Sequence, residues 1–446
     1  MRRCLILPPP VASVLIVLAL GWTGQAQPLT QATTPAKVLV QEVAGRWQLS
    51  VNGQPFFIKG AGLEFGDQEK LAAAGGNSFR TWRADHGREV LDRAQKNGLY
   101  VTMGLDVARE RHGFDYSNTN DVARQLVVIR AQVLALKDHP ALLMWDIGNE
   151  LNLEATNPKV WDAVNDISKM IHQIDPNHPT TTSLSGVSRE VVAALKQRAP
   201  DLDLLCFQSY ADIVNLPREI QDSGWTGPYV VTEWGATGHW ECGKTGWGAP
   251  IEDNSAVKAN LYLQRYQTAI ASDTNQCLGS YVFLWGQKQE RTPTWYGMFL
   301  PSGEATPAVD VMQYVWTGHW PEHRSPELEG LWLDGKTATG EVRLVSGQNY
   351  AAKVVAQLPT GGTPQYSWEI LPESAATSVG GDYEARPQPL PGLVTPGASG
   401  LAEIRAPEKP GAYRLFAYVF NGHGRAGYAN IPFFVEAKPG TVALQP

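Results

Sequence analysis

Two glutamates, Glu150 and Glu233, each stand directly after a strand-like segment and have the side chains for acid–base and nucleophilic chemistry. The first follows the apolar run Ala141–Met144, which reads as a strand covered on both faces. Asn149 precedes Glu150, and an amide beside a carboxylate is costly to bury unless each has a partner. The second glutamate directly follows the strand-like run Tyr229–Thr232. Two strands ending in glutamate predict a carboxylate pair, which is the machinery of glycoside hydrolysis.

The elements that must position these side chains alternate along the chain between Phe56 and Gly318. Strand-like segments cover residues 56–60, 77–82, 99–107, 141–149, 180–185, 202–210, 229–233 and 278–285. Helix-like segments follow them at 68–74, 88–97, 121–137, 158–173, 189–198, 217–222, 256–272 and 307–316. Eight successive β/α units predict an α/β protein with a parallel (β/α)8 TIM barrel.

The spacing of the two glutamates agrees with such a barrel. Glu150 ends the fourth predicted strand and Glu233 the seventh, 83 residues later, which fits three units of ~31 residues each. Polar residues at the carboxyl ends of barrel strands form the active site in these enzymes. We therefore expect the two carboxylates to face one another across the barrel mouth.

Three further parts are expected around the barrel, which is predicted to be a catalytic domain at 56–320. Residues 1–26 read as a signal peptide, with a basic start, an apolar stretch at Val11–Leu20 and small residues before a cleavage site near Ala26. This predicts an exported protein, periplasmic or secreted. Residues 27–55 are expected to form an N-terminal segment with a β-hairpin that turns at Asn52-Gly53. Residues 321–446 alternate in short runs between Gly/Pro-rich turns, which predicts a small all-β, immunoglobulin-like sandwich as an accessory domain.

Composition narrows the classes of partner. The net charge is −7 with no basic stripe, which argues against a nucleic-acid partner. After residue 26 no run reaches the ~20 apolar residues of a membrane span, so we expect no transmembrane anchor. The three cysteines that follow the signal segment lack metal-ligand spacing, so no metal is predicted, and no organic cofactor is implied. Fifteen Trp and fifteen Tyr supply flat rings suited either to core packing or to sugar faces.

The sequences around both glutamates resemble those of glycoside hydrolase clan A, especially the family 2 β-glycosidases. The stretch from His139 to Glu150 resembles the acid/base signature of the clan, and Thr232-Glu233-Trp234-Gly235 resembles its nucleophile motif. The resemblance covers the barrel and implies that Glu150 is the general acid/base and Glu233 the nucleophile.

The same resemblance implies roles for four supporting residues. Arg80, at the end of Asn77–Arg80, would hold the nucleophile ionised and in place, the alternative being a salt bridge at the barrel rim. Tyr210 would donate its hydroxyl to the nucleophile, although Gln208 stands where the family usually has Asn. Asn149 would bind the sugar 2-hydroxyl, and Trp285 would lie under the sugar.

Two further side chains have competing interpretations. His86 would contact the sugar or be an ordinary surface histidine. Trp240 lies in the long loop 236–254 with His239 and Trp247, and long loops in compact domains are usually functional or disordered. We expect this loop to form a wall of the substrate site, the alternative being that its rings anchor the loop by packing.

The predicted activity is that of a retaining β-glycoside hydrolase. It would cleave O-glycosidic bonds of a β-linked oligo- or polysaccharide, its carbohydrate substrate, through a glycosyl-enzyme. A β-glucan transglycosylase with the same two glutamates is the closest alternative, since the first half also resembles fungal glucanosyltransferases. A non-catalytic carbohydrate-binding protein is the alternative from another class.

Overall fold

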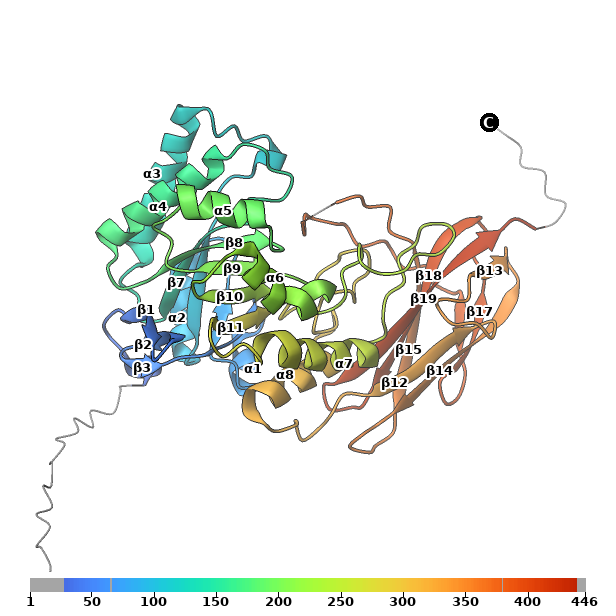
Figure 1. The fold of residues 1–446 in the computed structure, drawn as a ribbon. Coiled ribbons are helices and arrows are strands. Elements are labelled where there is room, and N and C mark those ends of the chain that lie inside the picture. The colour runs from blue at the N-terminus through green and yellow to red at the C-terminus, as the bar shows by residue number, and fades with distance from the viewer. Residues whose placement is uncertain (1–27, 65, 379, 439–446) are drawn as a thin grey trace, which may run out of the picture.

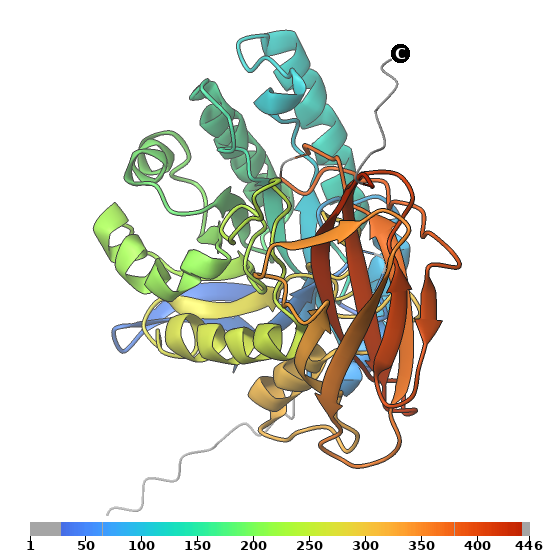
Figure 2. The ribbon, with the colours of Figure 1, turned by 90° about the vertical axis from the view of Figure 1, so that its right-hand side faces the viewer.

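The computed structural model describes residues 28–64, 66–378 and 380–438 of the 446-residue chain. A barrel and an all-β body lie side by side (Figures 1 and 2). The predicted signal peptide, with its cleavage site near Ala26, falls outside the described residues. No helix of the described part is both long and apolar enough to cross a bilayer.

Eight parallel strands close into a barrel and confirm the predicted TIM fold. The strands are β4 (Ile58–Gly62), β5 (Ser78–Arg80), β6 (Tyr100–Leu105), β7 (Leu142–Asn149), β8 (Thr180–Ser185), β9 (Leu205–Gln208), β10 (Tyr229–Glu233) and β11 (Cys277–Val282). Each neighbours the next in chain order, and β11 pairs with β4 to close the ring.

A helix follows each strand, as predicted. These helices are α1 (Gln68–Ala73), α2 (Gly87–Lys96), α3 (Thr119–Leu136), α4 (Lys159–Ile174), α5 (Arg189–Arg198), α6 (Leu216–Ser223), α7 (Ser255–Arg265, continued by a π-helical turn at Tyr266–Ile270) and α8 (Pro307–Thr317). Every residue of β7 is buried, which explains why its sequence shows no alternation of apolar and polar residues.

Near the middle of the barrel the interior is filled by Tyr281 of β11. Its hydroxyl lies 2.9 Å from that of Ser78 and 2.6 Å from that of Thr102, on strands across the lumen. A side chain at Gly60 would meet this ring, because a Cβ there would lie 2.4 Å from it. The barrel is therefore a packed core with no channel through it.

A small antiparallel sheet covers the amino ends of the barrel strands. It consists of β1 (Val38–Val43), β2 (Arg46–Val51) and β3 (Gln54–Pro55), so the expected hairpin is present and gains one further strand. Val38 and Leu49 share a buried cluster with residues that start barrel strands, such as Ile58 and Leu278. With that end covered, the carboxyl ends of the strands remain available for a site.

The C-terminal residues form two four-stranded sheets. One has the order β12 (Glu327–Leu333), β14 (Asn349–Gln357), β17 (Leu401–Arg405), β16 (Val394–Pro396), and the other β13 (Val342–Val345), β19 (Ala426–Glu436), β18 (Gly411–Phe420), β15 (Gln365–Pro372). All neighbours are antiparallel except β13 and β19. A single buried cluster draws residues from both sheets, which makes this body a β-sandwich.

A buried polar network joins the sandwich to the barrel. Lys258 of α7 is 4% exposed, and its ammonium lies 2.6 Å from Glu252 and 3.2 Å from the Tyr428 hydroxyl of β19. It also donates to the carbonyls of Thr294 and Trp295, each at 2.8 Å. The interface between the barrel and the sandwich thus contains a buried ammonium group, that of Lys258, whose partners come from both bodies.

Replacing Lys258 with alanine should cost about 3–5 kcal/mol of unfolding free energy, because it leaves the Glu252 carboxylate buried without its counter-ion. Urea denaturation followed by fluorescence measures this loss. The matched control is Arg405→Ala, which removes an exposed ion pair with Glu408 and should change the midpoint little, since water screens that pair. Equal midpoints for the two variants would contradict the importance of the buried network.

Candidate active site

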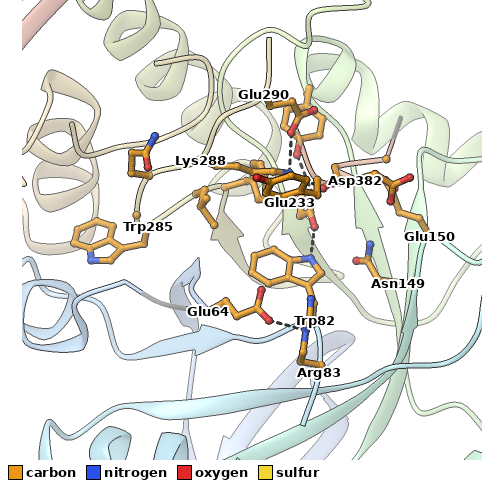
Figure 3. Close-up of a pocket in the computed structure, with 18 of the residues that line it drawn as sticks. Glu64, Trp82, Arg83, Asn149, Glu150, Glu233, Trp285, Lys288, Glu290 and Asp382 are labelled. Atoms are coloured by element: carbon orange, nitrogen blue, oxygen red, sulfur yellow. Dashed lines mark hydrogen bonds and ion pairs between the residues drawn. The ribbon is translucent and has the colours of Figure 1, made fainter. Parts of the chain in front are cut away.

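A cavity of about 630 Å³ opens at the carboxyl ends of the barrel strands. Both glutamates singled out in the sequence line it, Glu150 just after β7 and Glu233 at the end of β10 (Figure 3). Residues following β5 and β11 add further walls, and residues 380–383 reach it from the sandwich. The prediction that the two strand ends meet at one mouth is therefore realised in the fold.

Glu233 is held by four donors. Its Oε1 accepts from Arg80 Nη1 at 3.1 Å, Trp82 Nε1 at 2.8 Å and Gln208 Nε2 at 3.2 Å, and its Oε2 accepts from the Tyr210 hydroxyl at 2.8 Å. The residue is only 6% exposed. Such a cage fixes both oxygens and satisfies a buried anion, so Glu233 is oriented as a carboxylate that points into the cavity.

Arg80 is fully buried and serves two carboxylates. Besides Glu233 it contacts Asp146 at 3.1 Å, and Asp146 also accepts a hydrogen bond of 2.7 Å from Ser183. Burial raises the pKa of Asp146, while the Arg80 charge acts in the opposite direction. The guanidinium is thereby locked between β7 and β10, which keeps the Glu233 side chain in one position.

Asn149 presents its amide nitrogen to the cavity. Its Oδ1 accepts from Arg80 Nη2 at 2.8 Å and from Gln208 Nε2 at 2.6 Å, so the orientation of the amide follows from its partners. No described residue accepts a bond from its Nδ2. The backbone turns sharply here, with Gly148 at φ +78° and Glu150 at φ +51°, a conformation that is strained for a glutamate.

Glu150 has a different environment from Glu233. Burial raises the pKa of Glu150 to about 7, and the negative charge of Glu233 adds to the effect, while Ser185, Arg111 and Arg80 oppose it. Near neutral pH a large fraction of Glu150 thus carries a proton. One carboxyl group with a raised pKa and one held by four donors can thus supply an acid and a nucleophile in the same cavity.

Two other predicted site residues, Trp240 and His86, differ in whether they reach the cavity. Trp240 lines the cavity, is 56% exposed and packs edge-on against Tyr210 at 5.4 Å. His86 lies at the exposed start of α2 and is not among the cavity residues, so its predicted contact with a sugar is corrected to the surface alternative.

Trp285 also requires a correction. The residue lines the cavity, but its indole is fully buried, packs against Phe299 at 5.2 Å and Trp316 at 5.8 Å, and donates to the Asp67 carbonyl. In Figure 3 its ring points away from Glu233. Because the ring belongs to the packing between β11 and α8, it offers no face to a sugar.

Trp82 is a site residue that the sequence analysis missed. Its indole N–H donates to Glu233 at 2.8 Å, and its ring lies 5.0 Å from the Arg80 guanidinium. Its position in the sequence could have indicated this role. Trp82 lies two residues after Arg80, so it follows the same strand and lies at the same end of the barrel. Among the described residues no cluster of three metal-ligating side chains occurs.

Comparison with known proteins identifies the barrel. The family described as glycosyl hydrolases family 2, TIM barrel domain, matches residues 65–282. The β-glucuronidases of Pongo abelii and Homo sapiens are each 26% identical over 226 residues, which covers 42% of this chain and 32% of theirs. The chain thus spans about a third of the length of these relatives.

Solved structures share the fold. Bifidobacterium dentium β-glucuronidase, complexed with coumarin-3-O-glucuronide, aligns with a TM-score of 0.50 at 18% identity over 64% of this chain and 49% of that one. Dictyoglomus thermophilum β-D-glucuronidase gives 0.50 at 16% identity, over 64% of this chain and 54% of its own. The family match and the relatives support a glycoside hydrolase of clan A whose barrel is similar to that of family 2.

Proposed function

We propose that this protein is a retaining β-glycosidase, which hydrolyses O-glycosidic bonds of β-linked oligo- or polysaccharides through a glycosyl-enzyme. The observation that carries the proposal is the unequal state of the two glutamates. Glu233 is caged by four donors, whereas burial and the neighbouring charge raise the pKa of Glu150 to about 7. A carboxylate nucleophile held in place by donors and an acid that can carry a proton at neutral pH are what double displacement requires.

In the first step a Glu233 oxygen attacks the anomeric carbon while Glu150 gives its proton to the glycosidic oxygen. The bond from the anomeric carbon to that oxygen breaks, and the glycosyl group is left as an ester of Glu233. In the second step the Glu150 carboxylate takes a proton from water, the water oxygen attacks the anomeric carbon, and Glu233 leaves. The Asn149 amide nitrogen would donate to the sugar 2-hydroxyl, a contact that strengthens in the transition state.

The configuration of the first product tests the mechanism. Proton NMR of the reaction on an aryl β-glycoside should show the β-anomer of the sugar before mutarotation, because two inversions at the anomeric carbon restore its configuration. The α-anomer as first product would overturn the retaining assignment. Products longer than a β-linked oligosaccharide substrate would favour the transglycosylase, and binding of such oligosaccharides without cleavage would favour the non-catalytic alternative.

The sugar unit is proposed only as a β-linked glycone. The named relatives are β-glucuronidases, and an aryl β-glucuronide therefore belongs in the substrate panel with aryl β-glucosides, galactosides and mannosides. The cations that line the cavity already have acidic partners: Arg83 with Glu64, Arg109 with Asp106, Arg111 with Asp382 and Lys288 with Glu290. A uronate would have to compete with these carboxylates, so the panel starts with neutral and acidic sugars together.

The pH dependence follows from the acid. Because Glu150 must be protonated to assist departure of the leaving group and its pKa is about 7, kcat/KM on substrates with poor leaving groups should fall above that pH. The expected slope of this fall approaches tenfold per pH unit, and activity is retained on the acid side of the Glu150 pKa. Dinitrophenyl glycosides, whose leaving groups need no proton, should lack this alkaline limb. Identical profiles for both substrates would contradict the role of Glu150.

A further inference from the structure

The sandwich contributes directly to the candidate active site. Gly380, Gly381, Asp382 and Tyr383 line the same cavity as Glu150 and Glu233, although they lie in the connection between β15 and β16. The chain segment that carries them leaves the sandwich and reaches the barrel mouth. The contacts of this connection with the barrel show how firmly it is held at the cavity.

One anchor of this connection is an ion pair. The guanidinium of Arg111, which follows β6 and is only 4% exposed, donates to Asp382 Oδ2 at 2.9 Å and to Oδ1 at 3.3 Å. The backbone comes equally close, since a Cβ at Gly380 would lie 2.9 Å from Arg111 Nη2. Gly380 also has φ +57°, so a side chain here would be strained by its backbone conformation and would have to displace Arg111.

A second anchor lies on the far side of the connection, at the segment after β11. Glu384 is 6% exposed and accepts bonds from the backbone nitrogen of Arg291 at 3.0 Å and from Gln289 Nε2 at 3.1 Å. Lys288 donates to the carbonyl of Gly381 at 2.8 Å. The connection is thus bonded to the barrel at two strand ends and forms a fixed wall.

This wall lies on the same side of the cavity as Glu150, the proposed acid/base. The Arg111 charge that holds Asp382 also acts on Glu150, lowering its pKa against the effect of burial. In the view of Figure 3, Asp382 and Glu150 lie on the same side of the cavity, opposite Glu64 and Trp285. Since Glu150 protonates the leaving oxygen, the sugar that departs must occupy the space beside this wall.

Tyr383 places an aromatic ring beside the space that the departing sugar would occupy. It is 90% exposed while it lines the cavity, which is unusual for a large ring that has a packed domain on either side. Flat amphipathic rings pack well against the apolar faces of sugars. Because the backbone on both sides of Tyr383 is anchored, a sugar that packs on the ring has to immobilise only this side chain.

We propose that the sandwich completes the leaving-group subsite, with Tyr383 as the platform on which the departing sugar of a β-linked oligosaccharide packs and the Arg111–Asp382 pair as the anchor of that platform. The inference rests on the proposed glycosidase function and adds the substrate class to it. The substrate is a saccharide on both sides of the cleaved bond, and the all-β body serves as part of the catalytic cleft.

The test compares substrates that differ only in what occupies this subsite. The full-length protein is assayed on cellotetraose, laminaritetraose and β-1,4-galactotetraose, and on β-glucosyl and β-galactosyl fluoride, whose leaving group is a single atom. Tyr383→Ala should lower kcat/KM on the cleaved tetrasaccharide about tenfold, as loss of a packed ring predicts, and leave the fluoride unchanged. Asp382→Asn, which weakens the anchor, should act in the same direction.

The control is Tyr383→Phe, which keeps the ring and should retain both activities. Equal effects of Tyr383→Ala on tetrasaccharide and fluoride, or no effect on either, would overturn the assignment of the subsite while leaving the glycosidase function intact. A wild-type protein that cleaves none of the five substrates and none of the aryl β-glucuronides, glucosides, galactosides and mannosides of the panel would overturn both proposals.

Discussion

Replacing Glu233 with alanine is expected to abolish turnover on every β-glycoside, with a fall in kcat of at least ~10⁴-fold, because no other group replaces the nucleophile. The loss should extend to good and poor leaving groups alike, since without Glu233 the glycosyl-enzyme cannot form from either kind of substrate. Initial rates on an aryl β-glycoside and on a β-linked oligosaccharide measure it. Glu403→Ala, which changes an exposed glutamate of β17 in the sandwich, is the matched control and should retain wild-type rates.

The vacated site offers a further readout. Azide can enter where the Glu233 carboxylate stood and attack a glycosyl fluoride or a dinitrophenyl glycoside from that side, so a single inversion should give the α-glycosyl azide. Circular dichroism and the thermal midpoint show whether the variant is folded. A folded Glu233→Ala protein that keeps more than a tenth of its wild-type rate would remove Glu233 from the mechanism.

Replacing Glu150 with alanine should separate substrates by their leaving group. On oligosaccharides kcat should fall by ~10²–10⁴-fold, the usual contribution of a general acid, because the departing alkoxide receives no proton. On dinitrophenyl glycosides the glycosyl-enzyme should still form, and the slow step becomes its attack by water without a base. Azide, which needs no base, should restore turnover and give the β-glycosyl azide.

Three results belong together if this assignment is correct. They are a dependence on the leaving group, rescue by azide with retained configuration, and loss of the alkaline limb in the pH profile of the variant. Equal loss on activated and unactivated substrates, with no rescue, would show that Glu150 is not the acid/base. The opposite configurations of the azide products from the Glu150 and Glu233 variants then distinguish the two carboxylates by chemistry alone.

The barrel and its two glutamates were predictable because their signals are local. An apolar run such as Ala141–Met144 excludes an amphipathic helix, and β7 is accordingly buried along its whole length. Glycine and capping residues mark the helix ends, for example Asp67, whose carboxylate accepts from the Lys70 nitrogen at the start of α1. Once eight β/α units are counted, the topology of a closed barrel brings the ends of β7 and β10 to one mouth without further information.

The tertiary structure alone decided which other side chains share that mouth. The indole N–H of Trp82 donates to Glu233. Trp285 also follows a barrel strand, but its ring packs against Trp316 of α8. Sequence spacing does not distinguish these tryptophans, because ring direction depends on neighbours far away in the chain. The same holds for Asp382 and Tyr383, which the sequence assigns to a separate body and the docked sandwich delivers to the cavity. Strand order is set by local periodicity, while the walls of a site are set by long-range packing, which a single sequence does not encode in any regular spacing.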